Sequence, residues 1–163
     1  VPEVVGSKGR NSSECKVHQV GLSPPAGELV LPRKGDPPLA FIWAGIGMTP
    51  MIGMIEALAA QAGSPAVSII QIAYSETAAP FSGKLHSLAK EAKSPITLHT
   101  RLTSVDRRPD AAWIADRIPE NATCYLCGPT GFMRDMIQGL SKAGIPADRL
   151  RYETFGPDTG VTD

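Results

Sequence analysis

The chain has 163 residues, of which 42% are hydrophobic and 20% are charged, and this suits one compact domain with its own core. It carries 16 Lys and Arg residues against 16 Asp and Glu residues, and only 6% of its residues are aromatic. The balance argues against a nucleic-acid-binding protein, because displacing counterions from phosphates needs a surplus of cations. Three cysteines are too few for a disulfide framework and indicate a reducing compartment, so we expect a cytoplasmic protein.

Two features of the sequence bear on membranes. The N-terminus lacks the charged and apolar regions of a signal peptide. The uncharged stretch 39–55 approaches the length of a membrane span, but Gly45, Gly47, Pro50 and Gly53 interrupt it. We therefore interpret this stretch as a strand, a turn and a helix, and we expect no membrane span.

From Leu39 onward, apolar runs alternate with helical spacing, whereas residues 1–38 are rich in Pro, Gly, Ser and charge. The predicted strands are 39–44, 67–73, 96–102, 122–127 and 149–155. The predicted helices are 50–62, 84–93, 111–118 and 129–143. This alternation predicts an α/β fold, a doubly wound five-stranded parallel sheet with helices on both faces. Its first four strands look apolar enough for burial on both sides, and the fifth alternates like an edge strand.

In such a sheet, ligands bind beyond the carboxyl ends of the strands. The first strand ends in the sequence AGIGMTP, where Gly45 and Gly47 permit a tight turn close to a ligand. Thr49 is a candidate N-cap, and Pro50 suits the first helical position. The amides at this helix start would form an anion site, with a pyrophosphate as the expected occupant. A glycine-rich turn without a ligand is the alternative.

The fourth strand ends in CYLCGPTGFM. Its C-x-x-C spacing suggests zinc or redox chemistry, but residues three apart on a strand point to opposite faces. We therefore expect Cys124 and Cys127 to share neither a metal nor a disulfide, and we assign no metal site. Cys127 would face the ligand crevice, although a small buried apolar residue is the alternative. The fifth strand ends in RYETFGP, which is either part of the site or ordinary edge-strand sequence.

Together, these stretches resemble the NAD(P)-binding domain of the ferredoxin–NADP reductase superfamily. AGIGMTPM is similar to its nucleotide-binding loop, CYLCGPTGFM to its Cys-Gly-Pro motif, and RYETFGP to the flavohaemoglobin and oxygenase-reductase branch. GLSPPAGELVLP resembles the end of a preceding flavin domain. The resemblance implies strand order 3-2-1-4-5 and a nucleotide domain at 39–157. Residues 1–38 would then be the end of a flavin-binding barrel and a linker, and 158–163 a flexible tail.

The resemblance also implies roles for single residues. Gly45, Ile46, Gly47 and Met48 would hold the pyrophosphate through their amides, with Thr49 near the nicotinamide. Cys127 would lie beside nicotinamide C4. The residues expected to shape the cofactor's bed are Gly128, Pro129, Phe132 and Met133. The residues expected to cover the flavin ring are Glu153 and Phe155.

The implied chemistry is hydride transfer from nicotinamide C4 to FAD or FMN, followed by electron transfer to a haem, an iron–sulfur centre or another acceptor. It needs no catalytic base, and we interpret His18, His86 and His99 as structural or surface residues. The adenosine ribose would lie at Tyr74, Ser75 and Glu76. Glu76 could accept the ribose hydroxyls and repel a phosphate, which favours NAD.

Two questions stay open at the level of sequence. Lys84, Arg101, Arg107 or Arg108 could still bind the 2′-phosphate of NADP. The flavin-binding barrel is largely absent, so we expect a fragment of a longer reductase that binds nucleotide weakly and oxidises little NAD(P)H alone. Its partners would be a flavin domain, in cis or in trans, and a redox acceptor. The alternative is a non-catalytic module that senses nucleotide or binds a partner.

Overall fold

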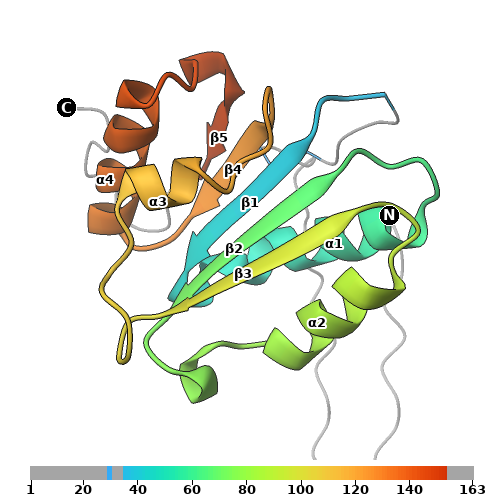
Figure 1. Ribbon diagram of the computed structural model, residues 1–163, viewed down its shortest axis with the longest axis horizontal. Helices are drawn as coiled ribbons and strands as arrows, with labels where there is room; N and C mark the ends of the chain where they lie inside the picture. Colours follow the sequence, from blue (N-terminus) through green and yellow to red (C-terminus); the bar gives the residue numbers. More distant parts are fainter. Residues whose placement is uncertain (1–28, 31–34, 154–163) are drawn as a thin grey trace, which may run out of the picture.

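The computed structural model describes residues 29–30 and 35–153, and within them one parallel sheet organises the chain (Figure 1). The strands are β1 (Leu39–Ala44), β2 (Val67–Ala73), β3 (Ile96–Leu102), β4 (Thr123–Cys127) and β5 (Leu150–Tyr152). Their order is β3-β2-β1-β4-β5, and every neighbouring pair is parallel. The predicted fold class and strand order are confirmed. The chain turns outward in both directions from β1, so the sheet has a topological switch point between β1 and β4.

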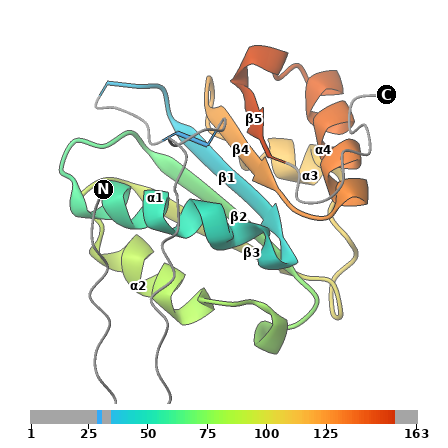
Figure 2. The same ribbon diagram turned by 180° about the vertical axis from the view of Figure 1, so that it is seen from behind.

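Two helices cover each face of the sheet (Figures 1 and 2). The helices are α1 (Thr49–Ala60), α2 (Ser82–Glu91), α3 (Ala111–Ala115) and α4 (Thr130–Lys142). Phe41 and Trp43 of β1 pack in one buried cluster with side chains of α1 and α2. Ala40 and Ile42 point the other way, into a cluster with side chains of α3 and α4. The alternation of side chains along β1 therefore divides the core into an α1 face and an α4 face.

Strand position decides how strongly each strand is buried. All seven residues of β2 are buried, as expected for a central parallel strand. By contrast, no residue of β3 is fully buried, although we expected a continuous apolar strand there. β3 is an outer strand of the sheet, so polar side chains such as His99 and Arg101 can alternate with Leu98 while they stay in contact with water. β5, at the other edge, alternates as predicted.

Capping contacts mark two helix ends at or next to their predicted positions, whereas the other predicted ends differ from the observed ones by one to three residues. The Asp110 side chain accepts a hydrogen bond of 2.8 Å from the Trp113 amide and caps α3. Beyond α4, Gly144 has φ +93°, and the Ile145 amide donates to the Leu140 carbonyl. This pairing is a Schellman cap, for which glycine is the favoured residue. The fourth strand begins one residue later than predicted, at Thr123.

The fifth strand, expected over 149–155, covers only Leu150–Tyr152, and Glu153 lies outside it. The domain limit at 157 and the tail 158–163 lie outside the described residues, and the limit at 38 stays a prediction. Among the described residues, no helix has the length and hydropathy needed to cross a membrane. Within the same ranges, no group of three or more His, Cys, Asp or Glu side chains is placed to hold a metal ion.

Candidate functional site

Two turns meet where the strands have their carboxyl ends: Gly45–Thr49 follows β1, and Cys127–Pro129 forms the end of β4 and the turn beyond it. We call these two segments the glycine corner. Gly45 has φ +59°, a left-handed conformation that side chains other than glycine adopt only with strain. It opens a 3₁₀ turn, η1 (Gly45–Met48), which leads directly into α1. The first amides of such a turn have no acceptor within the helix. The tight turn predicted at Gly45 is therefore present.

The two turns of the corner touch through their backbones. A Cβ atom built on Gly47 would lie 2.3 Å from the Cys127 carbonyl oxygen and 2.9 Å from the Gly128 nitrogen. One built on Gly128 would lie 2.7 Å from the Phe132 ring and 3.3 Å from the Ala44 nitrogen. Only glycine fits this approach at Gly47, because its nearest neighbours there are backbone atoms. Two motifs far apart in the sequence thus form one surface at the switch point.

The corner presents helix starts to solvent. η1 and α1 begin on one side, and α4 begins at Thr130 on the other. Helix N-termini carry partial positive charge and attract anions. Gly45 and Thr49 are exposed, and 74% of Ile46 is accessible to solvent, so no side chain of the described residues covers the turn completely. The predicted role of these amides in holding a pyrophosphate stays a prediction.

The expected capping role of Thr49 is wrong. Thr49 is the first residue of α1, and its hydroxyl donates a 3.3 Å hydrogen bond to the Ile46 carbonyl. Met48 occupies the N-cap position, and no side chain caps the helix there. The physical reason is the 3₁₀ turn, which extends the helical path upstream and moves the free amides back toward Gly45. Pro50 lies within the first helical turn, as predicted.

Cys127 ends β4 and is fully buried on the α1 face, where its Cα partner in β1 is Trp43. The pKa of the Cys127 thiol is raised to about 11, mainly by burial and also by the nearby Glu153 carboxylate. A hydrogen bond with the Gly128 backbone lowers this pKa and offsets part of the shift. Cys124 lies on the opposite face of the sheet, and burial raises its pKa to about 12. The two side chains lie on opposite faces of the sheet, as predicted, and both thiols are free. Each thiol therefore keeps its proton at neutral pH.

Around Cys127, the predicted site residues differ in exposure. Pro129 is exposed, and Phe132 is half-buried against the α4-face cluster. Met133 is fully buried beneath them, so it can shape the corner only by supporting it from below. The Glu153 carboxylate accepts a 3.5 Å hydrogen bond from the Leu29 amide. Phe155 lies outside the described residues.

The predicted ribose-binding segment follows β2. Tyr74 is 71% exposed, Glu76 is exposed, and the Ser75 and Thr77 hydroxyls lie 2.9 Å apart. Glu76 lines a cavity of about 520 Å³ beside β3. The segment after β3 is bound to this one, because the Thr103 and Ser104 amides donate to the Ala73 and Tyr74 carbonyls at 2.9 Å.

Known proteins with similar sequences are flavohaemoproteins. The chain is 27% identical over 151 residues to Flavohemoprotein A of Dictyostelium discoideum, covering 88% of this chain and 36% of that protein. The flavohemoglobin from Malassezia yamatoensis, solved with bound FAD and heme, shares 37% identity and a TM-score of 0.68 over 77% of this chain and 33% of that one. No family model matches the chain. The chain spans about a third of the length of these relatives.

Two further solved structures place the fold. The Flavohem-like-FAD/NAD Binding Domain of Nitric Oxide Dioxygenase from Vibrio cholerae shares 28% identity and a TM-score of 0.65, over 82% of this chain and 56% of that one. Ferredoxin-NADP+ reductase from Plasmodium falciparum, at 16% identity, has the same fold with a TM-score of 0.56. The chain has the NAD-binding-domain fold of the ferredoxin–NADP reductase superfamily. Its sequence is similar to the flavohaemoglobins of that superfamily.

One feature of the buried core was not predicted from the sequence. Trp43 and Gln71 are Cα partners in adjacent strands and are almost wholly buried. The Trp43 Nε1 and Gln71 Oε1 atoms have no hydrogen-bond partner among the described residues, while Gln71 Nε2 donates to the Pro80 carbonyl at 3.2 Å. The signal in the sequence was a single glutamine within the buried apolar run VSIIQIA. Gln71 ties the loop after β2 to the strand that carries it.

Proposed function

We propose that this chain is the NAD(P)H-binding part of a flavin-dependent oxidoreductase of the flavohaemoglobin type. The observation that carries the proposal is the backbone contact between Gly47 and Cys127, which joins the two predicted nucleotide motifs into one corner. When bound there, NAD(P)H supplies a hydride at nicotinamide C4 for FAD or FMN, and the flavin then feeds an electron acceptor.

The residues of the corner fit a dinucleotide. Its diphosphate would lie against the amides of Gly45, Ile46, Gly47 and Met48. The first two of these residues are exposed and the last two are buried, so Gly45 and Ile46 would make the first contacts. Two helix starts at one edge favour an anion more than either would alone. The absence of a Cβ at Gly47 lets the turns after β1 and β4 meet through their backbones, which brings the two helix starts to one edge of the sheet.

In this proposal, Cys127 acts as a neutral group. Its raised pKa of about 11 leaves the thiol protonated at neutral pH, so it would not act as a nucleophile. Because its side chain is fully buried, it would lie below the surface on which nicotinamide C4 is expected to rest. Glu153 lies close enough for its charge to affect that thiol. Together with Phe155, it would cover the flavin. Thr49 is exposed at the rim, where its backbone or side chain can meet the nicotinamide carboxamide.

We further propose NAD rather than NADP as the preferred cofactor. Two of the four cations considered for a 2′-phosphate are already engaged. Lys84 forms an ion pair with Glu56. Arg101 donates from Nε to the Arg107 carbonyl at 3.1 Å. Glu76 remains exposed at the segment expected to hold the ribose, where it can accept hydroxyl hydrogens.

The partners we propose are a flavin domain and a haem-bearing acceptor. The support is that the Malassezia relative carries FAD and heme and that this chain corresponds to a third of it. Iron–sulfur and other acceptors remain alternatives within the same chemistry. The alternative function, a nucleotide-sensing or partner-binding module, uses the same corner without hydride transfer.

Titration of the purified chain tests nucleotide binding. We expect NADH and ADP-ribose to shift the NMR amide signals of Gly45–Thr49 and of Gly128–Met133 at millimolar concentration. The amide signal of Asp148, which lies in the turn before β5 and away from the carboxyl ends of the strands, should not shift. A lack of shifts with NADH, NADPH and ADP-ribose would refute the proposal and favour a partner-binding module.

A second experiment separates a reductase from a sensor. Fusing a flavin domain of a similar flavohaemoprotein to this chain should restore NADH-dependent ferricyanide reduction. Cys127→Ala in the fusion should then slow hydride transfer more than it weakens NADH binding. A fusion that binds both cofactors but reduces no ferricyanide would favour the sensing module.

A further inference from the structure

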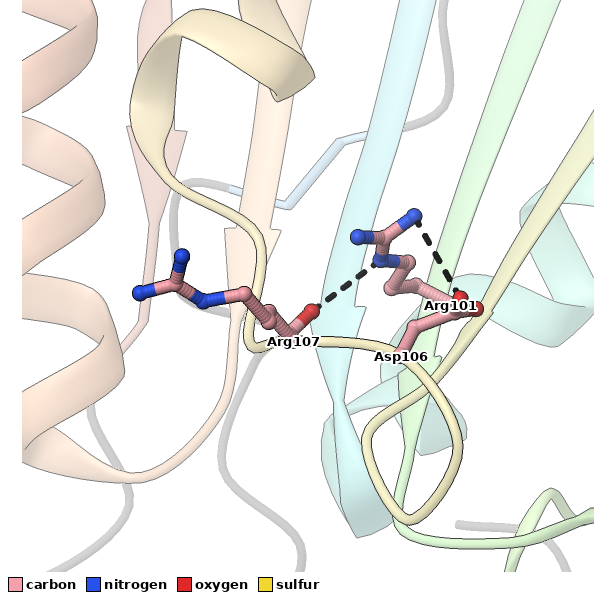
Figure 3. Close-up of polar contacts among 3 residues, drawn as sticks. All are labelled: Arg101, Asp106 and Arg107. Carbon is pink, nitrogen blue, oxygen red and sulfur yellow. Dashed lines mark hydrogen bonds and ion pairs between the residues drawn. The ribbon is translucent and has the colours of Figure 1, made fainter.

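The segment between β2 and α2 carries the proposed ribose site, and a neighbouring loop holds its first residues. Two amides of the loop after β3, residues 103–108, donate to the Ala73 and Tyr74 carbonyls at 2.9 Å. Arg101 steadies that loop by donating to the Arg107 carbonyl, as Figure 3 shows. Beyond Tyr74, a side chain from inside the core reaches the same segment.

That side chain is Gln71, which lies on the α1 face of β2 with only 1% of its surface accessible to solvent. Its Nε2 donates a 3.2 Å hydrogen bond to the Pro80 carbonyl, nine residues further along the chain. β2 ends two residues after Gln71, and α2 begins two residues after Pro80. This single hydrogen bond therefore joins the two ends of the segment.

The Gln71 amide has one preferred orientation. The Pro80 carbonyl only accepts hydrogen bonds, so the amide nitrogen, and not its oxygen, must face it. The amide Oε1 is then buried without a hydrogen-bond partner among the described residues, and so is Nε1 of Trp43, the Cα partner of Gln71 in β1. An indole N–H donates and an amide oxygen accepts, so these two buried atoms are complementary. The Trp43 donor thus favours the orientation that the Pro80 carbonyl requires.

Gln71 makes its hydrogen bond at a strained point of the chain. Phe81 adopts φ +59° and ψ +15°, a left-handed conformation that costs free energy for any residue with a Cβ. The Pro80 carbonyl belongs to the peptide group directly before Phe81, so holding its oxygen fixes the peptide plane from which that φ angle is measured. Such a conformation persists only where surrounding contacts enforce it, and Gln71 supplies one of them.

We propose that Gln71 is a positioning residue for the adenosine half of the proposed nucleotide site. It holds the segment between β2 and α2 in the shape that presents Glu76 to the ribose. The inference rests on the proposed function, because it needs the ribose at the end of β2. Gln71 is buried and acts through the Pro80 carbonyl, without touching the ligand. A segment that is already ordered loses less conformational freedom on binding, so the ligand binds more tightly.

Gln71→Met tests the proposal, because methionine keeps a buried, unbranched side chain but cannot donate to Pro80. The dissociation constant for ADP-ribose is measured by calorimetry on the full chain. We expect it to rise about threefold to tenfold, the size expected for one neutral hydrogen bond. In the ligand-free variant, the NMR amide signals of residues 76–81 should shift or broaden, whereas those of Gly45–Thr49 should not. A purely structural role would lower stability and leave the affinity as it is.

Ser68→Ala is the matched control. Ser68 is a second buried polar residue of β2, 3% exposed, and its hydroxyl donates a 2.7 Å hydrogen bond to the Arg117 carbonyl near the start of the strand. Its loss should lower stability without changing the affinity for ADP-ribose. Unchanged affinity in Gln71→Met, or an equal loss of affinity in Ser68→Ala, would overturn the inference, while ADP-ribose binding by the wild type upholds the proposed function.

A measurement on the wild type keeps the test valid if Gln71→Met does not fold. By linkage, a hydrogen bond that strengthens ligand binding is itself strengthened by the ligand to the same extent. Saturating ADP-ribose should therefore slow hydrogen exchange of the Gln71 side-chain amide by about threefold to tenfold. Exchange that ADP-ribose leaves unchanged would overturn the inference. If the wild type binds no ADP-ribose, the proposed function fails and the inference falls with it.

Discussion

The glycine corner and the loop after β3, residues 103–108, both follow the carboxyl ends of strands but are built in opposite ways. The corner is made of backbone, and a single methyl group on Gly47 would collide with the Cys127 carbonyl. The loop is made of exposed side chains, with Val105 84% accessible to solvent and the charged residues around it also exposed. Substitutions in the corner should therefore affect stability and binding together, whereas those in the loop should have little effect on folding.

The largest effect should come from Gly47→Ala. The added Cβ would lie 2.3 Å from the Cys127 oxygen and would force the turns after β1 and β4 apart. We expect the free energy of unfolding to fall by about 3 kcal/mol, the upper range for inserting one methyl group into a packed site. Urea denaturation measures this change, and ADP-ribose titration should show that binding is lost as well.

Gly53→Ala is the matched control. Gly53 lies within α1, and a Cβ there would meet nothing within 4 Å. Alanine should therefore raise the free energy of unfolding by about 0.5–1 kcal/mol through its higher helix propensity. Equal losses of stability in the two variants would show that the corner is not closely packed.

The next effect is a loss of stability at alkaline pH that the buried thiols cause. Folding raises the pKa of Cys127 from 9.0 to about 11 and that of Cys124 from 9.0 to about 12. Above pH 9 the unfolded chain releases these protons while the folded chain keeps them, so stability falls as pH rises toward the folded pKa values. Each thiol should contribute a slope approaching 1.4 kcal/mol per pH unit.

Urea denaturation at pH 8 and at pH 10 measures that slope. The double variant Cys124→Ala, Cys127→Ala keeps the contribution of Tyr125, whose pKa burial also raises. It should lose less stability than the wild type between the two pH values. The same slope in both proteins would contradict the burial of the two thiols.

A smaller effect is expected for Gly45→Ala. Its Cβ would meet nothing within 4 Å, so only the left-handed backbone at φ +59° opposes the substitution. We expect a loss of about 1 kcal/mol in the free energy of unfolding. Thermal denaturation should place this variant between Gly47→Ala and the wild type. A variant as unstable as Gly47→Ala would mean that contacts other than the turn are involved.

The smallest effect should come from Arg101→Gln. It removes the bond to the Arg107 carbonyl and the stacking on Trp113, both in a partly solvated position. We expect a loss of about 0.5–1 kcal/mol in the free energy of unfolding, with a normal signal pattern at the corner. Broadened amide signals confined to 103–108 would agree with a pinning role. Signal changes at Gly45–Met48 would contradict the independence of the two regions.

Local sequence patterns were sufficient to predict most of the sheet. The β-branched run Val67–Ala73 became a wholly buried strand because parallel central strands need apolar side chains on both faces. The alternation rule likewise placed Cys124 and Cys127 on opposite faces, which removed the apparent metal motif. These features depend on spacing along one element, which the sequence records directly.

Contacts between distant segments were beyond such patterns. Nothing in the spacing near Gly47 shows that its missing side chain makes room for the Cys127 carbonyl, since the two lie on different βα units. The 3₁₀ turn that displaced the cap from Thr49 contacts β2 and β4, which are also distant from it in the sequence. Arg101 looked free in the sequence, and only the folded loop brings the Arg107 carbonyl to it.

The position of Trp43 gives the corner a built-in optical reporter. This indole is fully buried one strand away from Cys127, and the only other tryptophan, Trp113, stacks against two guanidinium groups on the α4 side. Indole emission overlaps the absorption of a reduced nicotinamide. In a Trp113→Phe protein, quenching of a single fluorophore would therefore report when a dihydronicotinamide ring settles on the strand ends.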